Sequence, residues 1–426
     1  LSYCIMIVSV NTETKQVKLL SIMRDSLVRT EKKGKMSFGK INAVYQRGAA
    51  QSIRAINQNF GTDISDYVTV NFFGLAKIID ALDEYESVDT TLTAAYTWNL
   101  PVGTVPFYSQ GSWSAAMFAP ESAATPNSIG VFSLSSGSPV TLRSKPVLGA
   151  GYEFYDVRVG TGVFCWVEIN YSSFAWSLYA QAFADGQVSG DPQKIDHGNG
   201  DWEPPMFSPY GVCVIWQKMP NSSGSKSASS SKCYQWNLID GSKTTLYTSP
   251  GRFATHPRVS NDILTISPRV HEDEGTYYGM TALNLADSSH GQIDQLVLPA
   301  GVRPFEAAYL NDVFAFAIEA SYDGAGRLGN MGTFIGREGG PFVYISREPA
   351  AGVCGKGTRF CLKTRSSTCI VDTDAQKYSV VACPDRSLDY GDYPASEGAT
   401  DNLVTFATIK DAQGIPESVC VRVFSL

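Results

Sequence analysis

The 426-residue sequence contains no apolar run that approaches the length of a transmembrane helix, and no signal peptide is visible. The first residue is Leu rather than Met, so we expect a processed or partial chain whose membrane anchor lies upstream. Basic residues are not in excess either, because the formal net charge is −7. This balance argues against nucleic acid as a partner, since phosphate binding needs a basic face.

The sequence also lacks a C-x-x-C pair, which argues against a zinc ribbon or a thioredoxin-type site. Four of the nine cysteines fall within thirty residues: Cys354, Cys361, Cys369 and Cys383. Such crowding predicts the disulfides of an exported protein. Cys213 and Cys233 flank a Ser/Gly-rich stretch and are candidates for a cross-link between the two strands of one hairpin. For Cys4 and Cys165, which lie in apolar strands, buried free thiols are an equal alternative.

We find no Ser-His-Asp arrangement and no pair of carboxylates that can be placed as a catalytic site. His256, His271 and His290 fall in one predicted repeat, but their spacing does not suit a metal. Residues 372–377 form an acidic turn without the Gly and the distal Glu of a calcium loop. Five aromatic residues are candidates for stacking on sugars, with packing as the expected alternative: Trp113, Trp166, Trp202, Trp216 and Tyr152.

Length and charge distribution divide the chain. A chain of this length predicts two or more domains or one large repeat architecture. Residues 1–86 carry 11 Lys and Arg against 9 Asp and Glu, whereas the remaining residues carry 23 against 32. The basic residues of the first part concentrate between Arg24 and Arg54. Such a cluster suits a phosphorylated ligand, with a solvated face as the alternative.

The first 86 residues contain both strand and helix patterns. Residues 5–10 and 17–22 are apolar, β-branched runs joined by a turn-rich link, and they predict a hairpin. Residues 47–60 have helical spacing that ends at a glycine, residues 67–72 alternate as a strand, and residues 75–82 are again helical. This order predicts helices packed on a mixed sheet.

Within this segment, Arg24 and Asp25 stand side by side where a buried strand ends, and Lys40 follows fifteen residues after Asp25. Four spaced blocks carry a resemblance: residues 5–9, 21–26, 40–45 and 67–72, the last followed by Gly74 and residues 80–82. Together they resemble the first half of the LytR-CpsA-Psr family over residues 1–86. Members of that family are envelope enzymes that transfer a glycopolymer, such as teichoic acid, from a polyprenyl pyrophosphate carrier to peptidoglycan.

The resemblance implies roles for five residues. Arg24 would contact the pyrophosphate, and Asp25 would bind Mg²⁺, so both would be catalytic. Lys40 would contact phosphate, while Asn42 and Tyr45 would shape the substrate pocket. The chemistry is consistent, because Mg²⁺ prefers carboxylate and phosphate oxygens and because phosphoryl transfer is catalysed mainly by positioning and charge stabilisation.

The chain departs from the family pattern in two ways. Tyr3 stands where the family has a metal-binding Asp, and no segment after residue 86 has the form R-x-R followed by D-x-x-R-x-x-R-Q. Such arginines would stabilise the charge of the transition state. The departures define two hypotheses: a phosphotransferase, or an inactive segment attached to a module with another function.

After residue 89 the helical periodicity stops and a strand repeat begins. Near-continuous apolar strands start at Val163, Val212, Ile263, Val313 and Leu403. The first four starts are 49, 51 and 50 residues apart, and the last gap is 90 residues, close to two shorter periods. A repeat of forty to fifty residues with four short strands is typical of a β-propeller blade.

We therefore predict a mainly β chain in which residues 87–426 form a β-propeller after the partial α/β segment of residues 1–86. Seven blades are preferred, near residues 102–146, 150–196, 200–248, 252–298, 302–348, 355–384 and 388–426. Six blades are the alternative, with the cysteine-rich residues 350–384 as an insertion. The last blade lacks a clear fourth strand, which we expect residues 90–100 to supply. In the spacing of their predicted strands, residues 87–426 resemble TolB-like and related secreted propellers.

These observations predict an extracytoplasmic protein of the cell envelope. If residues 1–86 are active, the expected activity is a Mg²⁺-dependent phosphotransferase acting on a polyprenyl-pyrophosphate-linked glycopolymer. The alternative is a β-propeller that binds or scaffolds a protein or a carbohydrate without catalysis.

Overall fold

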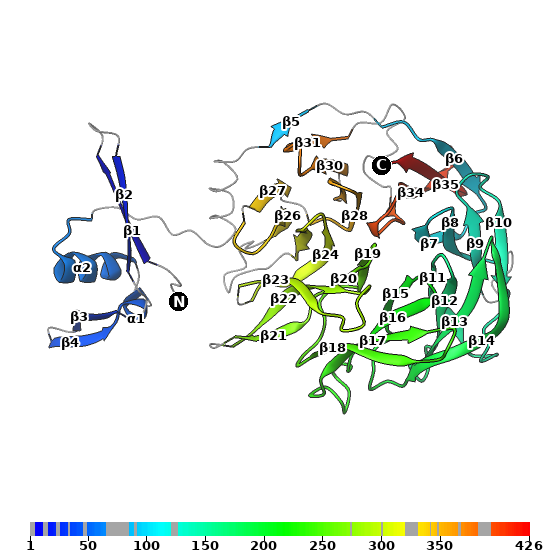
Figure 1. The fold of residues 1–426 in the computed structure, drawn as a ribbon, viewed down its shortest axis with the longest axis horizontal. Helices are drawn as coiled ribbons and strands as arrows, with labels where there is room; N and C mark the ends of the chain where they lie inside the picture. The colour runs from blue at the N-terminus through cyan, green and yellow to red at the C-terminus, as the bar shows by residue number, and fades with distance from the viewer. Residues whose placement is uncertain are drawn as a thin grey trace. The chain divides into compact units, whose positions relative to one another are not determined.

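The structure is a computed structural model that describes residues 5–11, 16–22, 26–32, 35–45, 49–64, 85–88, 92–120, 127–272, 275–299, 301–319, 331–340, 342–346, 349–364, 368–381 and 393–426. The chain divides into two compact units, Leu1–Asn71 and Phe72–Leu426. Each unit is described by itself (Figure 1). None of the helices in the described ranges is both long and apolar enough to span a membrane.

The first unit contains two β-hairpins and two helices. The strands are β1 (Ile5–Asn11), β2 (Gln16–Ile22), β3 (Leu27–Lys32) and β4 (Lys35–Lys40), and the helices are α1 (Ile41–Tyr45) and α2 (Ala49–Phe60). β1 pairs antiparallel with β2, and β3 pairs antiparallel with β4. The predicted first hairpin is therefore confirmed. The second hairpin was not predicted.

Helix α2 confirms the helical pattern of residues 47–60. It ends at Gly61, whose φ of +64° is readily adopted by glycine and whose N–H donates to the carbonyl of Asn57 at 3.0 Å. The apolar side chains of the helices and strands form a small core: Ile22, Val28, Ile41, Val44, Ala55 and Ile56. The strand predicted over residues 67–72 and the helix predicted over 75–82 lie outside the described residues.

The second unit is a ring of antiparallel sheets around one axis, as Figure 1 shows. The first blade is formed by β7 (Thr104–Gln110), β8 (Trp113–Phe118), β9 (Ser128–Ser133) and β10 (Pro139–Arg143). The second is formed by β11 (Glu153–Val159), β12 (Val163–Asn170), β13 (Ala175–Ala184) and β14 (Gln187–Gly198). The third is formed by β15 (Met206–Tyr210), β16 (Cys213–Lys218), β17 (Ser231–Asn237) and β18 (Lys243–Ser249).

Three further blades continue the ring. The fourth contains β19 (Arg258–Ser260), β20 (Ile263–Ile266), β21 (Arg269–Glu272), β22 (Gly275–Asn284) and β23 (Gln292–Val297). The fifth contains β24 (Pro304–Leu310), β25 (Val313–Ile318), β26 (Gly332–Gly336) and β27 (Phe342–Ser346). The sixth contains β28 (Gly352–Lys356), β29 (Arg359–Lys363), β30 (Thr368–Asp372) and β31 (Lys377–Val380). At one edge of this blade, β33 (Gly398–Ala399) pairs in parallel with β28. At the other edge, β5 (Glu86–Ser87) pairs in parallel with β31, and β5 straddles the predicted domain boundary.

A composite sheet closes the ring with strands from both ends of the unit. It contains β32 (Tyr393–Pro394), β34 (Asn402–Lys410), β35 (Pro416–Ser425) and β6 (Tyr96–Leu100). β6 pairs antiparallel with β35, with Leu100 opposite Val419. Trp98 of β6 also donates its indole N–H to the carbonyl of Leu134 at 2.9 Å, which joins the composite sheet to the first blade. The prediction that residues 90–100 supply the missing strand is therefore confirmed.

The predicted mainly β chain with a propeller is confirmed. Six blades are built around consecutive strands, and the preferred number of seven holds only if the composite sheet is counted with them. Residues 350–384 were considered as an insertion in the six-blade alternative. Their described part instead forms the four paired strands β28 to β31, so the insertion is wrong.

The repeated apolar runs are explained by burial on both faces of each blade. In β12 every residue from Val163 to Ile169 is buried, because β12 is an inner strand and the neighbouring blades cover both faces of its sheet. Such strands read as continuous apolar runs rather than alternating ones. Apolar clusters lie between consecutive sheets all round the ring, including one between the composite sheet and the first blade.

The disulfide predictions are not supported. Six described cysteines are free and buried: Cys165, Cys213, Cys233, Cys354, Cys361 and Cys369. Cys420 is buried as well. The predicted link between Cys213 and Cys233 is wrong, because the strand register places Asn237 opposite Cys213 and Gln217 opposite Cys233. Free thiols of this kind behave as small apolar core residues. Cys4 and Cys383 lie outside the described residues.

Candidate functional site

In the first unit, the backbone brings together the two sequence blocks predicted to bind phosphate. The N–H of Ile41, next to Lys40, donates to the carbonyl of Ser26, next to Asp25, at 2.9 Å. In the β3–β4 ladder Leu27 lies opposite Lys40. The fifteen-residue separation in the sequence is therefore closed by a hairpin, and Lys40 enters the same neighbourhood as the end of the Arg24-Asp25 block.

The predicted site residues are described to different extents. Lys40 is exposed at the end of β4. Asn42 and Tyr45 lie in α1, but their side chains are outside what the structure describes. Arg24 and Asp25 are outside the described residues altogether. The structure therefore places Lys40 and the backbone of α1, while the proposed Mg²⁺ ligand Asp25 stays a prediction.

Helix α1 is held in place by two core side chains. Ile41 is fully buried and Val44 is 3% exposed, and both belong to the core of the first unit. Residues three apart on a helix share one face, so this pair anchors the helix directly after Lys40. The position of the Lys40 backbone is thus fixed both by the ladder and by the helix that follows it.

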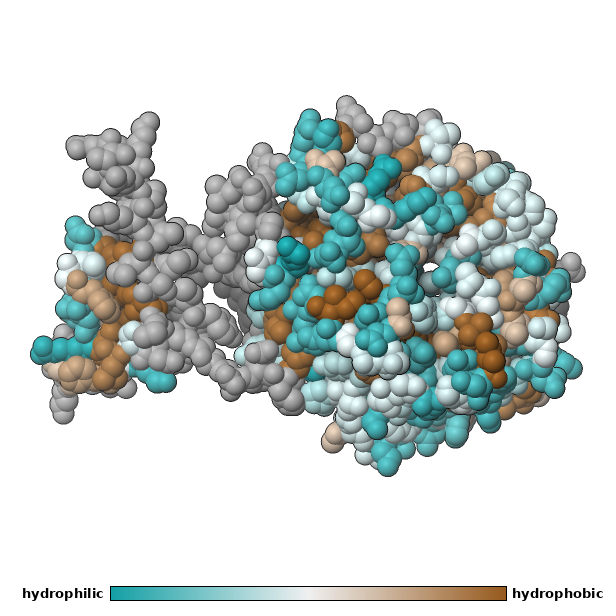
Figure 2. All heavy atoms as spheres, viewed as in Figure 1, coloured by the Kyte–Doolittle hydropathy of each residue, from teal (hydrophilic) through white to brown (hydrophobic). Residues whose placement is uncertain are grey.

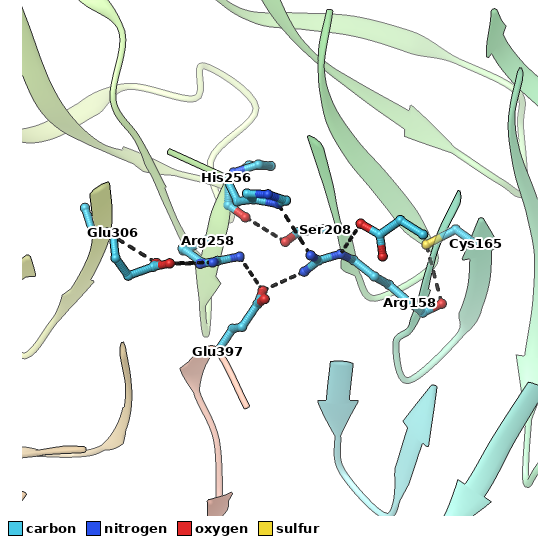
Figure 3. A network of polar contacts seen from close by, with 10 residues as sticks. Arg158, Cys165, Ser208, His256, Arg258, Glu306 and Glu397 are labelled. Carbon is cyan, nitrogen blue, oxygen red and sulfur yellow. Dashed lines mark hydrogen bonds and ion pairs between the residues drawn. The ribbon is translucent and has the colours of Figure 1, made fainter. Parts of the chain in front are cut away.

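The propeller contains a second arrangement, which the sequence analysis did not identify. Arg158 lies on β11, Arg258 on β19 and Glu306 on β24, which are the first strands of the second, fourth and fifth blades. Glu397 precedes β33. Figure 3 shows the Glu397 carboxylate between the two guanidinium groups. We call Arg158, Arg258, Glu306 and Glu397 the axial ion network.

The geometry of the axial ion network is that of close, charge-assisted pairs. Glu306 accepts two hydrogen bonds from Arg258, at 2.7 and 2.6 Å. Glu397 accepts from Arg158 at 2.6 Å and also from Arg258. The first three residues are only 4–6% exposed, and the Glu397 side chain is 17% exposed. Paired, hydrogen-bonded burial of this kind is how a folded protein accommodates interior charge.

Glu397 reaches the two arginines because the next residue is glycine. Gly398 has a φ of +59°, and a Cβ at this position would lie 2.1 Å from the carbonyl oxygen of Val259 in β19. Only glycine combines that conformation with so close a backbone approach. The sequence Glu-Gly therefore delivers a carboxylate from the last part of the chain to the strand that carries Arg258.

Neighbouring groups extend the axial ion network. The guanidinium of Arg158 donates to Nδ1 of His256 at 3.4 Å and lies 5.2 Å from the ring centre of Tyr108. Burial, then Arg258 and Arg158, hold the pKa of His256 well below its ordinary value. Asp156 lies 3.6 Å from Arg158, and burial raises the pKa of its carboxyl group. One carboxylate oxygen of Asp156 is buried without a hydrogen-bond partner.

The remaining sequence candidates have structural roles where they are described. Trp166 and Trp216 are fully buried, and each donates its indole N–H to a buried carboxylate, Glu168 at 2.9 Å and Asp196 at 2.7 Å. In the 372–377 turn, Asp372 accepts from the backbone N–H groups of residues 374 and 375. The packing and turn alternatives are therefore the better interpretations.

The other candidates add no metal site. Trp113 and Trp202 are partly buried against interblade clusters, and Tyr152 is partly buried. His290 lies in a turn with a φ of +48°, while the side chain of His271 in β21 is not described. Within the described ranges, no group of three or more His, Cys, Asp or Glu side chains is arranged to hold a metal ion.

Sequence comparison finds matches to the first part of the chain. Residues 2–99 match the LytR_cpsA_psr family. Over 79 residues the chain is 37% identical to the Polyisoprenyl-teichoic acid--peptidoglycan teichoic acid transferase TagU of Halalkalibacterium halodurans, an alignment that covers 18% of this chain and 25% of that protein. The chain thus spans about a quarter of the length of this curated relative. The family match runs as far as β6, which the structure places in the propeller.

Structure comparison returns solved proteins at low similarity, among them one β-propeller domain. The β-propeller domain of the Trilobed protease from Pyrococcus furiosus is 8% identical, with a TM-score of 0.49, and covers 77% of this chain and 95% of that chain. An oligogalacturonate lyase in complex with manganese is 10% identical, with a TM-score of 0.45, and covers 80% of this chain and 98% of that chain. At these values neither likeness informs the function of this chain.

Proposed function

We propose, from the premise that residues 2–99 match the LytR_cpsA_psr family, that this chain is a cell-envelope protein whose first unit binds a polyprenyl-pyrophosphate-linked glycopolymer. In this proposal Arg24 and Lys40 contact the phosphates, Asp25 holds Mg²⁺, and Asn42 and Tyr45 line the pocket. The related transferase is named for moving teichoic acid to peptidoglycan, and the same class of substrate is the one proposed here.

The observation that carries the proposal is the hydrogen bond between Ile41 and Ser26, with the Leu27–Lys40 pairing beside it. A pyrophosphate needs several positive charges within a few ångströms, because one cation does not offset its charge. The proposal is supported by the backbone contact next to Lys40, because Ser26, which accepts the Ile41 N–H, directly follows Arg24 and Asp25 in the sequence. Mg²⁺ on a single carboxylate would complete its coordination with phosphate oxygens and water.

We expect Arg24→Ala to weaken binding of farnesyl pyrophosphate to the full chain by about tenfold or more, because a hydrogen bond to a charged group contributes roughly 1.5–3 kcal/mol. Lys40→Ala should weaken binding less, because a lysine acts as a single point charge. Calorimetric titration with and without Mg²⁺ measures both effects, and chelation of Mg²⁺ should weaken binding of the unaltered chain.

Lys145→Ala is the matched control, because Lys145 is an exposed lysine of the propeller. Its affinity for farnesyl pyrophosphate should equal that of the unaltered chain. Unchanged binding by Arg24→Ala, or equally tight binding of farnesyl monophosphate, would sink the proposal.

A second candidate is a non-catalytic binding role for the propeller, towards a protein or a carbohydrate. Every described strand of the ring lies between Glu86 and Ser425, so the propeller takes no strand from β1 to β4 of the first unit. This observation favours a propeller with a role of its own. We expect a fragment of residues 85–426 to unfold in one cooperative thermal transition and to co-sediment with peptidoglycan sacculi as the full chain does. A fragment starting at residue 101 lacks β6 and is the comparison that should melt at lower temperature. Loss of co-sedimentation by a folded 85–426 fragment would overturn this candidate.

A further inference from the structure

A group of exposed aromatic residues lies at one end of the second blade. Tyr155 of β11 is 42% exposed, and Tyr171 and Phe174, in the turn between β12 and β13, are 52% and 58% exposed. The strand register brings them to the same end of the sheet, because β11 begins where β12 ends and β13 begins. Three large aromatic side chains exposed together exceed the scattered exposure of an ordinary surface. We call Tyr155, Tyr171 and Phe174 the aromatic rim.

Two carboxylates adjoin the aromatic rim. Burial raises the pKa of Tyr155, with contributions from the nearby Tyr171 and Glu203, and burial followed by Glu153 raises the pKa of Tyr171. Glu153 is exposed, while Glu203 forms an ion pair with Arg252 and its side chain is 30% exposed. Since an ionised carboxylate only accepts hydrogen bonds, the rim combines aromatic rings with acceptors for hydroxyl groups.

The backbone holds two of the three rings in unusual positions. The two neighbours of Tyr155 in β11 lie opposite consecutive residues of β12, so Tyr155 is the extra residue of a β-bulge. Phe174 has a φ of +55°, a conformation that bulky residues rarely adopt. Asn170 holds the turn by accepting hydrogen bonds from the N–H groups of Ser172 and Ser173 at 3.0 Å each. The rings are therefore presented by an ordered backbone.

The bulge with an aromatic residue recurs in the fifth blade. Phe305 of β24 is the residue without a partner in the ladder with β25, and it is 49% exposed. The residues that follow the two bulges, Asp156 and Glu306, form ion pairs with Arg158 and Arg258 of the axial ion network. In both blades the bulge thus turns an aromatic ring outwards just before a residue that faces the axis.

We propose that the aromatic rim binds an uncharged saccharide, whose ring stacks on the exposed aromatic side chains and whose hydroxyl groups donate to Glu153 and Glu203. The C–H face of a sugar ring is apolar and packs on an aromatic face, and a few polar groups then fix its orientation. The two carboxylates disfavour an anionic glycan. This inference rests on the second candidate function, because it names the residues and the carbohydrate class for the propeller.

The aromatic rim suits a sugar better than a protein surface. A protein interface has a broad centre from which charged residues are depleted, whereas carboxylates stand beside the rings of the rim. Figure 2 shows a similar layout on the face of the propeller that it presents, with small hydrophobic groups set among hydrophilic residues. A single sugar ring matches a site of that size.

The test is native affinity electrophoresis of the full chain through gels that contain dextran, hydroxyethyl cellulose or glycol chitin, each beside its carboxymethylated form. We expect at least one uncharged polysaccharide to retard the chain, and its carboxymethylated form to retard it less. Tyr155→Ala and Tyr171→Ala should each weaken the retardation about threefold to tenfold, the contribution of one aromatic contact. Glu153→Gln with Glu203→Gln should reduce the discrimination against the carboxymethylated form.

Phe174→Gly separates binding from stability. Glycine adopts a φ of +55° without strain, so the thermal transition should change little, whereas the retardation should weaken as in the tyrosine variants. The control is Ile239→Ala, a residue of the β17–β18 turn that is 80% exposed, which should leave both measurements unchanged.

The outcomes separate this site from the functions proposed above. Absence of retardation by all three uncharged polysaccharides, or equal retardation of the unaltered chain and both tyrosine variants, would overturn the proposal. Co-sedimentation with sacculi that every rim variant leaves unchanged would keep the second candidate function and overturn this site. Binding of farnesyl pyrophosphate should be the same in all rim variants, so the function of the first unit is tested separately.

Discussion

Glu397→Ala is expected to lower the free energy of unfolding of the propeller by about 3–5 kcal/mol, the range for removing one partner of a buried ion pair. Glu397 accepts hydrogen bonds from two arginines that are each less than 7% exposed. Its removal leaves Arg158 with the weaker Asp156 contact and Arg258 with Glu306 alone. Both buried guanidinium groups then lose a carboxylate that offsets the free-energy cost of removing their charge from water.

The measurement is urea denaturation of the full chain, followed by tryptophan fluorescence because the tryptophans lie in the propeller. The matched control is Glu319→Ala, since Glu319 forms an ion pair with Arg303 at 3.5 Å in which both side chains are about half exposed. Exposed pairs contribute about 0–1 kcal/mol, so this control should unfold almost as the unaltered chain does. If Glu397→Ala shifted the transition no more than Glu319→Ala, the axial ion network would not stabilise the ring.

Glu397 lies far from its two arginine partners in the sequence, so the axial ion network contributes to closure of the ring. Glu397 follows Arg158 by 239 residues and Arg258 by 139, so these contacts form only when the last part of the chain has returned to the axis. The pairing of β6 with β35 closes the rim of the ring in the same way. Loss of either contact should therefore affect closure of the ring more than the stability of a single blade.

The blades could be predicted from the sequence because each contains a strand buried on both faces. A strand such as β12 has no solvent-facing side, and its apolar run recurs about every fifty residues. The closing strand β6 was predictable for a related reason, since the last blade lacked a strand and an unpaired edge is unfavourable. The β3–β4 hairpin was missed because Val28 and Thr30 are its principal inward residues, too few to give a strand pattern among lysines.

The axial ion network could not be predicted because its members are separated by up to 239 residues and meet only at the axis of the ring. A weak signal was present: Arg158 and Arg258 each interrupt an apolar first strand, in the sequences Val157-Arg158-Val159 and Pro257-Arg258-Val259. The link between Cys213 and Cys233 was wrongly predicted from cysteine spacing, because strand register and not spacing decides which side chains are opposite each other. For the proposed pyrophosphate site, the structure describes only that the backbone next to Lys40 bonds Ser26, and the placement of Arg24 and Asp25 stays a prediction.

Acidification from pH 6.5 to pH 5 is expected to destabilise the propeller through His256. In the folded chain, burial and the two nearby arginines hold the His256 pKa well below its ordinary value, whereas the unfolded chain takes up the proton near pH 6.5. The unfolded state therefore binds more protons, and the contribution of His256 is complete above pH 6.5 and is lost as the pH falls below it. The free energy of one proton limits this loss to at most about 1.4 kcal/mol per pH unit.

His256→Gln removes the titrating group while keeping a side chain that can accept the Arg158 hydrogen bond. Its unfolding free energy, measured by urea denaturation at several pH values, should fall less between pH 6.5 and pH 5 than that of the unaltered chain. The comparison is between the two slopes, so the carboxyl groups present in both chains, including Asp156 and Glu306 whose pKa values are raised by burial, contribute to both. His197→Gln is the control, because His197 is exposed and its replacement should leave the slope unchanged. Equal slopes for His256→Gln and the unaltered chain would mean that His256 is protonated within the fold, and the Arg158 contact would then have to be repulsive rather than a hydrogen bond.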